Sequence, residues 1–194
     1  VGGQPLFSYF LREFAGFDET GQSLYPNGDV QQFVGKSALP TTNLGISTSV
    51  QYLNWDLSAF LTGQFGHYIY NNTENAFFTA GAIGNGRNVT QNVIGNGESN
   101  LNAPDVSTRF LEKGDFLRMQ NLTLGYNFDI AEESLFNTLR LSLTGQNLFV
   151  ITDYTGLDPE VDTNKALNNV PSAGIDYTAY PRPTTVTFGL NASF

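Results

Sequence analysis

The chain has 194 residues with 9 Lys and Arg, 18 Asp and Glu, one His and no Cys, giving a formal net charge of −9. This acidic balance argues against nucleic acid or an anionic membrane surface as a partner, because either would need a basic patch. The lack of cysteine excludes a disulfide framework and thiol chemistry. No apolar run approaches the ~18 residues of a transmembrane helix, whereas a barrel strand needs only ~9 to 11.

The N-terminal region predicts one strand followed by a turn-rich segment. Residues 1–5 carry no basic region and no apolar signal core, so we expect a mature domain or a piece of a longer one. Residues 6–16 are rich in Phe and Tyr and predict a strand, although Arg12 and Glu13 interrupt it. Residues 17–40 hold many Gly, Asp, Asn and Pro and exceed a hairpin loop in length.

Residues 44–65 predict a hairpin. Apolar and small polar residues alternate on both sides of a turn at Leu53 and Asn54, and Tyr52 and Trp55 flank that turn. Amphipathic rings at one level suggest an aromatic girdle at a membrane interface. A cross-strand aromatic pair in a soluble hairpin is the alternative.

Three further segments complete the pattern. Residues 67–108 are polar and rich in Gly and Asn, which predicts a loop with little regular structure. Residues 109–128 predict a strand whose apolar parity shifts, so we expect a bulge near Gln120 and Asn121. An acidic connection over 129–138 leads to a strand over 139–151.

The C-terminal strand carries the strongest signal. After a loop over 152–181, apolar residues alternate with Thr, Gly, Asn and Ser from residue 183 to Phe194, without a charge. A transmembrane barrel strand shows this pattern when its apolar face meets lipid and its small polar face meets the lumen. An edge strand of a soluble sandwich is the alternative.

Short and long connections alternate along these six predicted strands. If the long loops share one end, the short turns share the other, as in bacterial outer-membrane barrels with periplasmic turns and extracellular loops. We therefore predict an all-β fold of antiparallel up-and-down strands, with the C-terminus at the periplasmic face. The predicted membrane-interface aromatics are Tyr52, Trp55, Tyr126, Phe128 and Phe194.

The sequence gives little support for metal binding or catalysis. Asp158, Glu160, Asp162 and Asn164 are spaced like the start of a calcium loop, but Thr163 stands where that loop has Gly, and Asn169 stands where it has Glu. A solvated acidic loop is the favoured interpretation. His67 has no Cys or second His beside which it could bind zinc or act in catalysis. Glu132 and Glu133 are expected to be solvated surface residues. We therefore assign no catalytic residue, metal or cofactor.

Three motifs together resemble the C-terminal region of SusC/RagA-family TonB-dependent outer-membrane transporters. They are residues 114–126 (GDFLRMQNLTLGY), residues 145–149 (GQNLF) with 154–160 (YTGLDPE), and residues 180–183 (YPRP) with the closing strand. The similarity extends back through residues 63–71 and more loosely to the N-terminus. It implies that the chain forms about the last six strands of a large transmembrane β-barrel, whose plug domain lies upstream and outside this chain.

The resemblance also implies a function and partners. The intact protein would import oligosaccharides or peptides, powered through TonB by its missing N-terminal part, with a SusD-like lipoprotein over its extracellular mouth and outer-membrane lipid around it. Exposed loop aromatics and acids are the candidate ligand or partner contacts. They are Tyr154, Asp158, Glu160, Tyr177 and Tyr180.

Other functions remain open at this point. A soluble all-β module that binds glycan would place an opposing sheet, instead of lipid, against the apolar faces. A passive porin would share the strand pattern but lack a plug and a lipoprotein partner. An enzyme ranks last.

Overall fold

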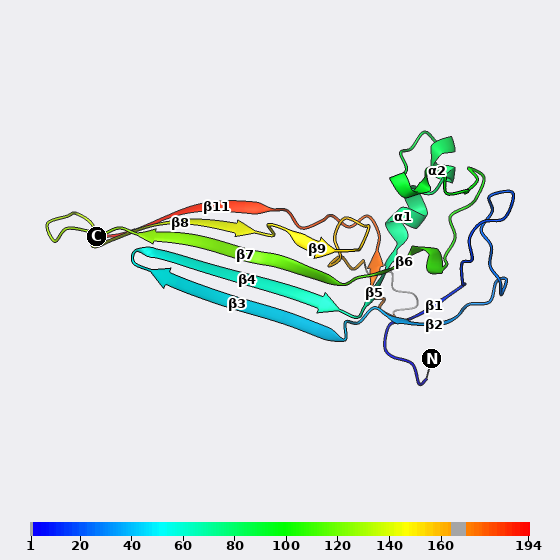
Figure 1. Cartoon of the computed structure of the whole chain (residues 1–194), viewed down its shortest axis with the longest axis horizontal. Coiled ribbons are helices and arrows are strands. Elements are labelled where there is room, and N and C mark those ends of the chain that lie inside the picture. The colour runs from blue at the N-terminus through cyan, green and yellow to red at the C-terminus, as the bar shows by residue number, and fades with distance from the viewer. Residues whose placement is uncertain (1, 164–169) are drawn as a thin grey trace. The chain divides into compact units, whose positions relative to one another are not determined.

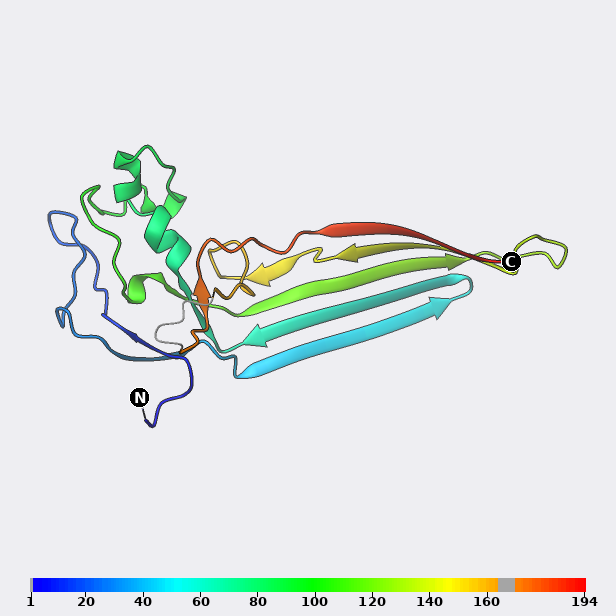
Figure 2. The same cartoon turned by 180° about the vertical axis from the view of Figure 1, so that it is seen from behind.

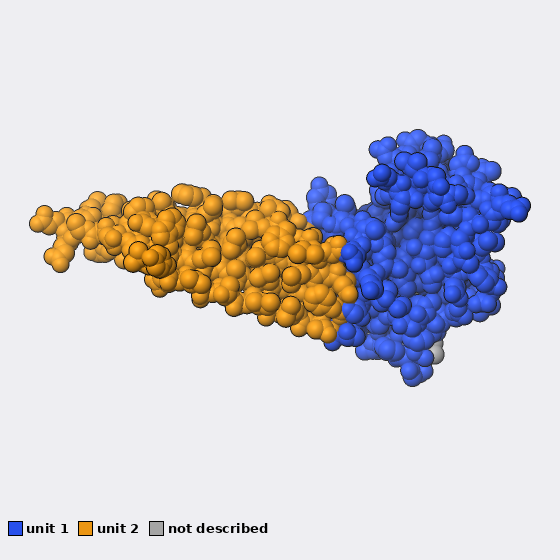
Figure 3. All heavy atoms as spheres, in the orientation of Figure 1, with its two compact units in different colours: residues 1–41, 66–114, 153–181 blue, residues 42–65, 115–152, 182–194 orange. Residues whose placement is uncertain are grey.

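The computed structural model describes residues 2–163 and 170–194 and divides into two compact units (Figure 3). We call residues 42–65, 115–152 and 182–194 the strand unit. We call residues 1–41, 66–114 and 153–181 the loop unit. Each unit is described separately.

The strand unit is one antiparallel sheet of long strands (Figures 1 and 2). Its order is β11-β8-β7-β4-β3, and the short β9 pairs with the beginning of β7. The strands are β3 (Thr42–Tyr52), β4 (Trp55–Phe65), β7 (Phe116–Asn127), β8 (Thr138–Gln146), β9 (Val150–Thr152) and β11 (Thr185–Ser193). The predicted all-β, antiparallel, up-and-down arrangement is confirmed.

The register of this sheet sorts its side chains onto two faces. Tyr52 pairs with Trp55, Trp55 with Tyr126, Tyr126 with Leu141, and Leu141 with Leu190, so one row crosses all five long strands. Directly opposed residues point to the same side, and side chains alternate along each strand. The apolar face therefore carries Leu44, Ile46, Val50, Tyr52, Trp55, Leu57, Ala59, Leu61, Met119, Leu122, Leu124, Tyr126, Leu139, Leu141, Leu143, Val186, Phe188, Leu190 and Ala192.

The opposite face is polar along most of its length, and the apolar face is exposed. On the polar face, Ser, Thr, Asn, Gln and Gly predominate in all five long strands. On the apolar face, Phe188 is 70% and Val50 58% exposed. A soluble sandwich would cover such a face with a second sheet. No second layer covers it within the described part of the strand unit.

The short connections lie at one end of this sheet. Leu53 adopts a left-handed conformation (φ 51°), which closes the two-residue turn between Tyr52 and Trp55. Residues 128–137 join β7 to β8 at the same end, because Asn127 pairs with Arg140 there. The long segments leave from the opposite strand ends. The predicted alternation of short and long connections is thus confirmed for β3 to β11.

The predicted bulge is confirmed at Gln120. In the pairing of β4 with β7, Phe60 lies opposite Asn121 and Leu61 opposite Met119, so Gln120 is the extra residue. Its side-chain Nε2 donates to Thr62 Oγ1 at 2.9 Å. The insertion returns Met119 to the apolar face, which explains the parity shift in the sequence.

Two strand predictions are wrong in part. The strand predicted over 6–16 is reduced to β1 (Ser8–Leu11), which pairs with β2 (Gln32–Ser37) in the loop unit and not with the long strands. Its aromatics do not alternate, so no face is apolar throughout. The strand predicted over 139–151 is divided into β8 and β9, because Asn147 adopts a left-handed conformation (φ 50°) that ends the extended chain.

The loop unit is more regular than its polar sequence predicts. A three-stranded sheet has the order β10-β5-β6, where β10 (Ile175–Asp176) runs parallel to β5 (Tyr68–Asn71) and β6 (Leu111–Lys113) antiparallel to it. The helical segments are α1 (Asn72–Phe77), α2 (Gly81–Gly84), η1 (Gln91–Val93) and η2 (Thr108–Phe110). The small core consists of Tyr9, Leu11, Ala38, Tyr70 and Phe110. The prediction of little regular structure over 67–108 is therefore wrong in part.

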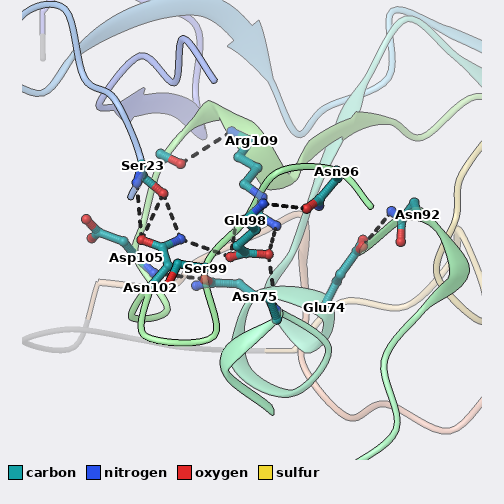
Figure 4. A network of polar contacts seen from close by, with 12 residues as sticks. Ser23, Glu74, Asn75, Asn92, Asn96, Glu98, Ser99, Asn102, Asp105 and Arg109 are labelled. Atoms are coloured by element: carbon teal, nitrogen blue, oxygen red, sulfur yellow. Dashed lines mark hydrogen bonds and ion pairs between the residues drawn. The ribbon is translucent and has the colours of Figure 1, made fainter. Parts of the chain in front are cut away.

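A buried ion pair holds the Asn-rich part of the loop unit together (Figure 4). Arg109 Nη1 and Nη2 donate to the two carboxylate oxygens of Glu98 at 2.6 and 2.7 Å. Asn102 Nδ2 and the Ala80 N–H donate to the same carboxylate. Burial by itself would raise the pKa of Glu98, but these hydrogen bonds and the Arg109 charge lower it below its usual value.

We predict that the two faces of β11 respond differently to charge. Phe188→Lys places an ammonium in the middle of the apolar face, and Thr187→Lys places it on the polar face of the same strand. If lipid covers the apolar face, Phe188→Lys lowers the free energy of unfolding by about 2–4 kcal/mol and Thr187→Lys leaves it nearly unchanged. Urea unfolding of the intact protein in lipid vesicles measures both. Equal losses would contradict the assignment of the faces.

We predict that Glu98→Gln loosens the loop unit, because it leaves the Arg109 charge buried without its counter-charge. The expected cost is about 3–5 kcal/mol. Amide hydrogen exchange over residues 72–107 should accelerate at pH 7, whereas Glu133→Gln, which alters an exposed acid, should have no effect.

The same ion pair predicts a pH dependence. The folded pKa of Glu98 is depressed from 4.5, so its contribution is complete above that pH and is lost as the pH falls through the folded value. Protection of residues 72–107 in the wild type should therefore fall on acidification, and in Glu98→Gln it should change less. An identical acid response in both proteins would contradict this assignment.

Candidate functional site

The predicted interface aromatics gather at the turn end of the strand unit. The Trp55 and Tyr126 ring centroids are 4.7 Å apart, and Tyr126 meets Phe128 edge-on at 4.8 Å. Tyr52 follows Val50 on the apolar face and is 72% exposed. Phe194 comes directly after the last residue of β11, and its ring lies 5.1 Å from that of Phe136. The structure thus brings the five predicted aromatics to one end of the sheet.

A shallow apolar depression lies beside these rings. It has a volume of about 280 Å³, and its walls include Trp55, Tyr126, Leu141 and Phe188. The lining carries no charged side chain and is mostly apolar, and the Trp55 indole and the Tyr126 hydroxyl are among its few hydrogen-bonding groups. The surface is chemically suited to hydrocarbon, and the aromatic rings at its end are suited to a headgroup boundary.

The polar face of the strand unit contains an ion pair that spans three strands. Arg140 Nη2 on β8 donates to Asp56 Oδ2 on β4 at 2.6 Å, across β7. Gly125 on β7 lies under this bridge, and a Cβ there would come within 2.5 Å of Asp56 Oδ1 and would overlap the Arg140 guanidinium. Asn127 Nδ2 also donates to Asp56, at 3.3 Å. A larger residue at position 125 would therefore push the ends of these two side chains aside.

The five predicted ligand or partner residues are not gathered into one exposed surface. Tyr154 and Asp158 are buried, with exposed fractions of 5% and 2%. The Tyr154 hydroxyl donates to Asp176 Oδ2 at 2.7 Å; burial raises its pKa, and the hydrogen bond and negative charge of Asp176 raise it further. The Glu160 N–H donates to Asp158 Oδ1 at 2.9 Å.

The two remaining tyrosines differ from each other. The Tyr177 ring stacks on Phe77 at 5.9 Å, with an angle of 28° between the ring planes. Tyr180 is 94% exposed and is the most accessible of the predicted residues. Tyr154 and Asp158 therefore lie inside the loop unit, whereas the Tyr180 side chain lies on its surface.

The residues considered for metal binding and catalysis are dispersed or buried. Within residues 2–163 and 170–194, no three His, Cys, Asp or Glu side chains are grouped to hold a metal ion. Asn164 and Asn169 of the calcium-loop pattern lie outside the described residues. His67 is buried next to Gly114, and Glu132 and Glu133 are exposed. No helix among the described residues is long and apolar enough to cross a bilayer.

Sequence reasoning missed a polar group around Asn71. Asn71 Oδ1 accepts from the Glu74 N–H at 3.0 Å, which caps α1, and Asn71 Nδ2 donates to Glu112 Oε1 at 2.9 Å. An Asn followed three residues later by Glu is a helix-start signal, so the helix cap at Asn71 could have been predicted from the sequence. The link to Glu112 was not, because 41 residues separate the two.

Comparison with curated proteins gives matches to TonB-dependent receptors. The chain is 31% identical over 172 residues to TonB-dependent receptor P3 of Formosa agariphila, covering 80% of this chain and 16% of the relative. It is 30% identical over 209 residues to TonB-dependent receptor SusC of Bacteroides thetaiotaomicron, covering 99% of this chain and 18% of the relative. The chain therefore spans less than a fifth of these relatives. No family model matches it.

Comparison with solved structures gives the same fold. The structure of the RagAB peptide transporter covers 96% of this chain with a TM-score of 0.78 and 24% sequence identity, and 22% of that transporter chain is matched. The RagAB peptide importer in its open-open state matches with a TM-score of 0.77. The resemblance found from the three sequence motifs is confirmed. The chain belongs to the SusC/RagA family of TonB-dependent receptors, and its long strands are part of the barrel of such a receptor.

Proposed function

We propose that the intact protein imports oligosaccharides or peptides across the bacterial outer membrane and that this chain supplies part of its barrel wall and loops. The observation that carries this proposal is the division of the strand unit into an exposed apolar face and an opposite polar face. Long strands with these two faces satisfy their backbone hydrogen bonds laterally, present hydrocarbon to lipid and present polar groups to a lumen. The similarity to SusC supports the transport role.

The proposed orientation follows from the connections. The turn at Leu53 and the link over 128–137 would face the periplasm with the C-terminus, and the aromatics at that end would lie at the inner headgroup level. The loop unit would belong to the extracellular side. The chain would then form the C-terminal portion of the barrel, and the plug domain and the contact with TonB would lie in upstream residues.

A SusD-like lipoprotein is the proposed partner at the extracellular side. The support comes from the family to which the chain belongs and from the exposed apolar and aromatic side chains of the loop unit, among them Tyr180 and Leu101. Residues of this kind are common in protein interfaces. Tyr177 and Glu160 remain candidate contacts, whereas Tyr154 and Asp158 would act from inside the unit.

The alternative functions have less support. A soluble glycan-binding module needs an opposing sheet on the apolar face, and the described part of the strand unit has none. A passive porin shares the two-faced sheet, but the relatives are TonB-dependent receptors. No observation favours an enzyme.

Isolation from the native membrane tests the transport proposal. We expect a chain much larger than 21 kDa that requires detergent, migrates differently before and after boiling, and is accompanied by a lipoprotein. Deletion of the gene should abolish growth on the oligosaccharide or peptide that the cell takes up through it. A detergent-independent species of about 21.2 kDa would overturn the proposal.

Epitope insertion tests the orientation separately. A tag after Gly97, an exposed position in the loop unit, should bind antibody on intact cells. A tag after Glu133, in the short link between β7 and β8, should bind antibody only after the outer membrane is permeabilised. The reverse accessibility would place the C-terminus on the outside and contradict the proposed topology.

A further inference from the structure

The loop unit holds a cavity with an unusual division of polar groups. Its volume is about 250 Å³. Phe78, Leu157 and Ala179 form apolar parts of its wall, whereas Asn71, Glu74 and Asp176 are its strongly polar groups. Asn71, Glu74 and Asp176 are each buried to more than nine-tenths. Mostly apolar walls with a few convergent polar groups are typical of small-ligand sites.

The hydrogen-bond donors in this wall are already committed. Asn71 Nδ2 donates to Glu112 Oε1 at 2.9 Å and to Glu74 Oε2 at 3.4 Å. The Thr73 hydroxyl donates to Asp176 Oδ1 at 3.1 Å, and the Thr155 hydroxyl to Glu112 Oε1 at 2.9 Å. The cavity therefore has few donors left to offer a ligand.

The hydrogen-bond acceptors, in contrast, are only partly used. Asp176 accepts from Thr73 and Tyr154, and Glu74 accepts through its side chain from Asn71, Thr90 and Asn92. A carboxylate has about four acceptor positions. Asp176 thus keeps about two and Glu74 about one, so a ligand must bring roughly three donors.

The cavity is also negatively charged. Among the described residues, the ion pairs of Arg12, Arg109 and Arg140 are made with other carboxylates and do not neutralise Glu74 or Asp176. The raised pKa of Tyr154 has burial as its largest cause, followed by the hydrogen bond to Asp176 and the charges of Asp176, Glu112 and Glu74. Two buried carboxylates that have no ion-paired cation among residues 2–163 and 170–194 favour a positively charged ligand.

We propose that this cavity binds the ammonium group of a lysyl side chain in a peptide ligand. An ammonium has three N–H donors and one positive charge, which match the open acceptors and the uncompensated negative charge. The four methylenes of lysine suit the wall of Phe78, Leu157 and Ala179. The volume equals that of about eight water molecules at ~30 Å³ each, which admits one side chain and excludes a whole oligomer.

This inference rests on the proposed import function and selects basic peptides among its ligands. Binding is measured with three probes on the intact receptor in detergent: Nα-acetyl-lysine amide, Nα-acetyl-norleucine amide and norleucine amide. Saturation-transfer NMR should detect the first probe and neither of the others. Equal binding of norleucine amide would assign the cavity to a terminal amine and overturn the proposal, as would equal binding of the neutral probe.

Variants locate the binding in this cavity. Asp176→Asn keeps the shape and one acceptor but removes a charge, so affinity for Nα-acetyl-lysine amide should fall about tenfold. Leu157 is 70% exposed, so its replacement leaves the fold intact. Leu157→Lys should fill the cavity with its own ammonium and abolish probe binding. Ile94→Lys, at an exposed position that does not line the cavity, should retain it. Binding unchanged in both Asp176→Asn and Leu157→Lys would overturn the assignment.

The outcomes separate this inference from the transport proposal. If cells take up nutrient through the protein but the purified receptor binds no lysine probe, the cavity assignment fails and the transport proposal stands. If the probe binds in the predicted manner but deletion of the gene leaves uptake unchanged, the cavity assignment stands and the transport proposal fails.

Discussion

The register of the five long strands is the constraint on which the strand unit depends. Side chains in a strand alternate with a period of two, so a slip by one residue in any pair would turn a whole apolar set to the polar side. Each pair of neighbouring strands must therefore keep the register that places residues from Tyr52 to Leu190 in one row across the sheet. The extra residue at Gln120 keeps that phase where the sequence would otherwise lose it. For the separation of the two faces, the position of a side chain in the alternating pattern matters more than which apolar or polar residue it is.

The loop unit is held by a different principle. Its apolar core is small, and its Asn- and Gly-rich segments cannot bury enough apolar surface to be ordered by the hydrophobic effect alone. Side chains that bond to distant backbone or to other side chains supply part of the difference. The Glu98–Arg109 pair and the bond between Asn102 and the Ser23 N–H join segments that are otherwise loops. A polar segment can therefore be ordered when its hydrogen-bond donors and acceptors are paired with each other.

The sequence predicted the sheet well because the information is local. Alternation over 44–65, the parity shift near Gln120 and the uninterrupted C-terminal strand each follow from neighbouring residues. The strand predicted over 6–16 is mostly absent, because a high content of aromatics is not the same as alternation. The loop unit could not be predicted in this way, since Ser23 and Asn102 are 79 residues apart in the chain. For the same reason exposure was misjudged for Tyr154, whose partner Asp176 lies 22 residues away.

Gly125, beneath the Asp56–Arg140 bridge, restricts which substitutions this part of the sheet can accept. A side chain at position 125 displaces both charged groups at once, whereas loss of the charges removes the reason for the glycine. A larger residue fits at position 125 when smaller neutral residues replace Asp56 and Arg140, or when the ends of these two side chains turn away. Positions 56, 125 and 140 on three neighbouring strands are thus linked by steric contact, although 69 residues separate the first of them from the second and 15 the second from the third.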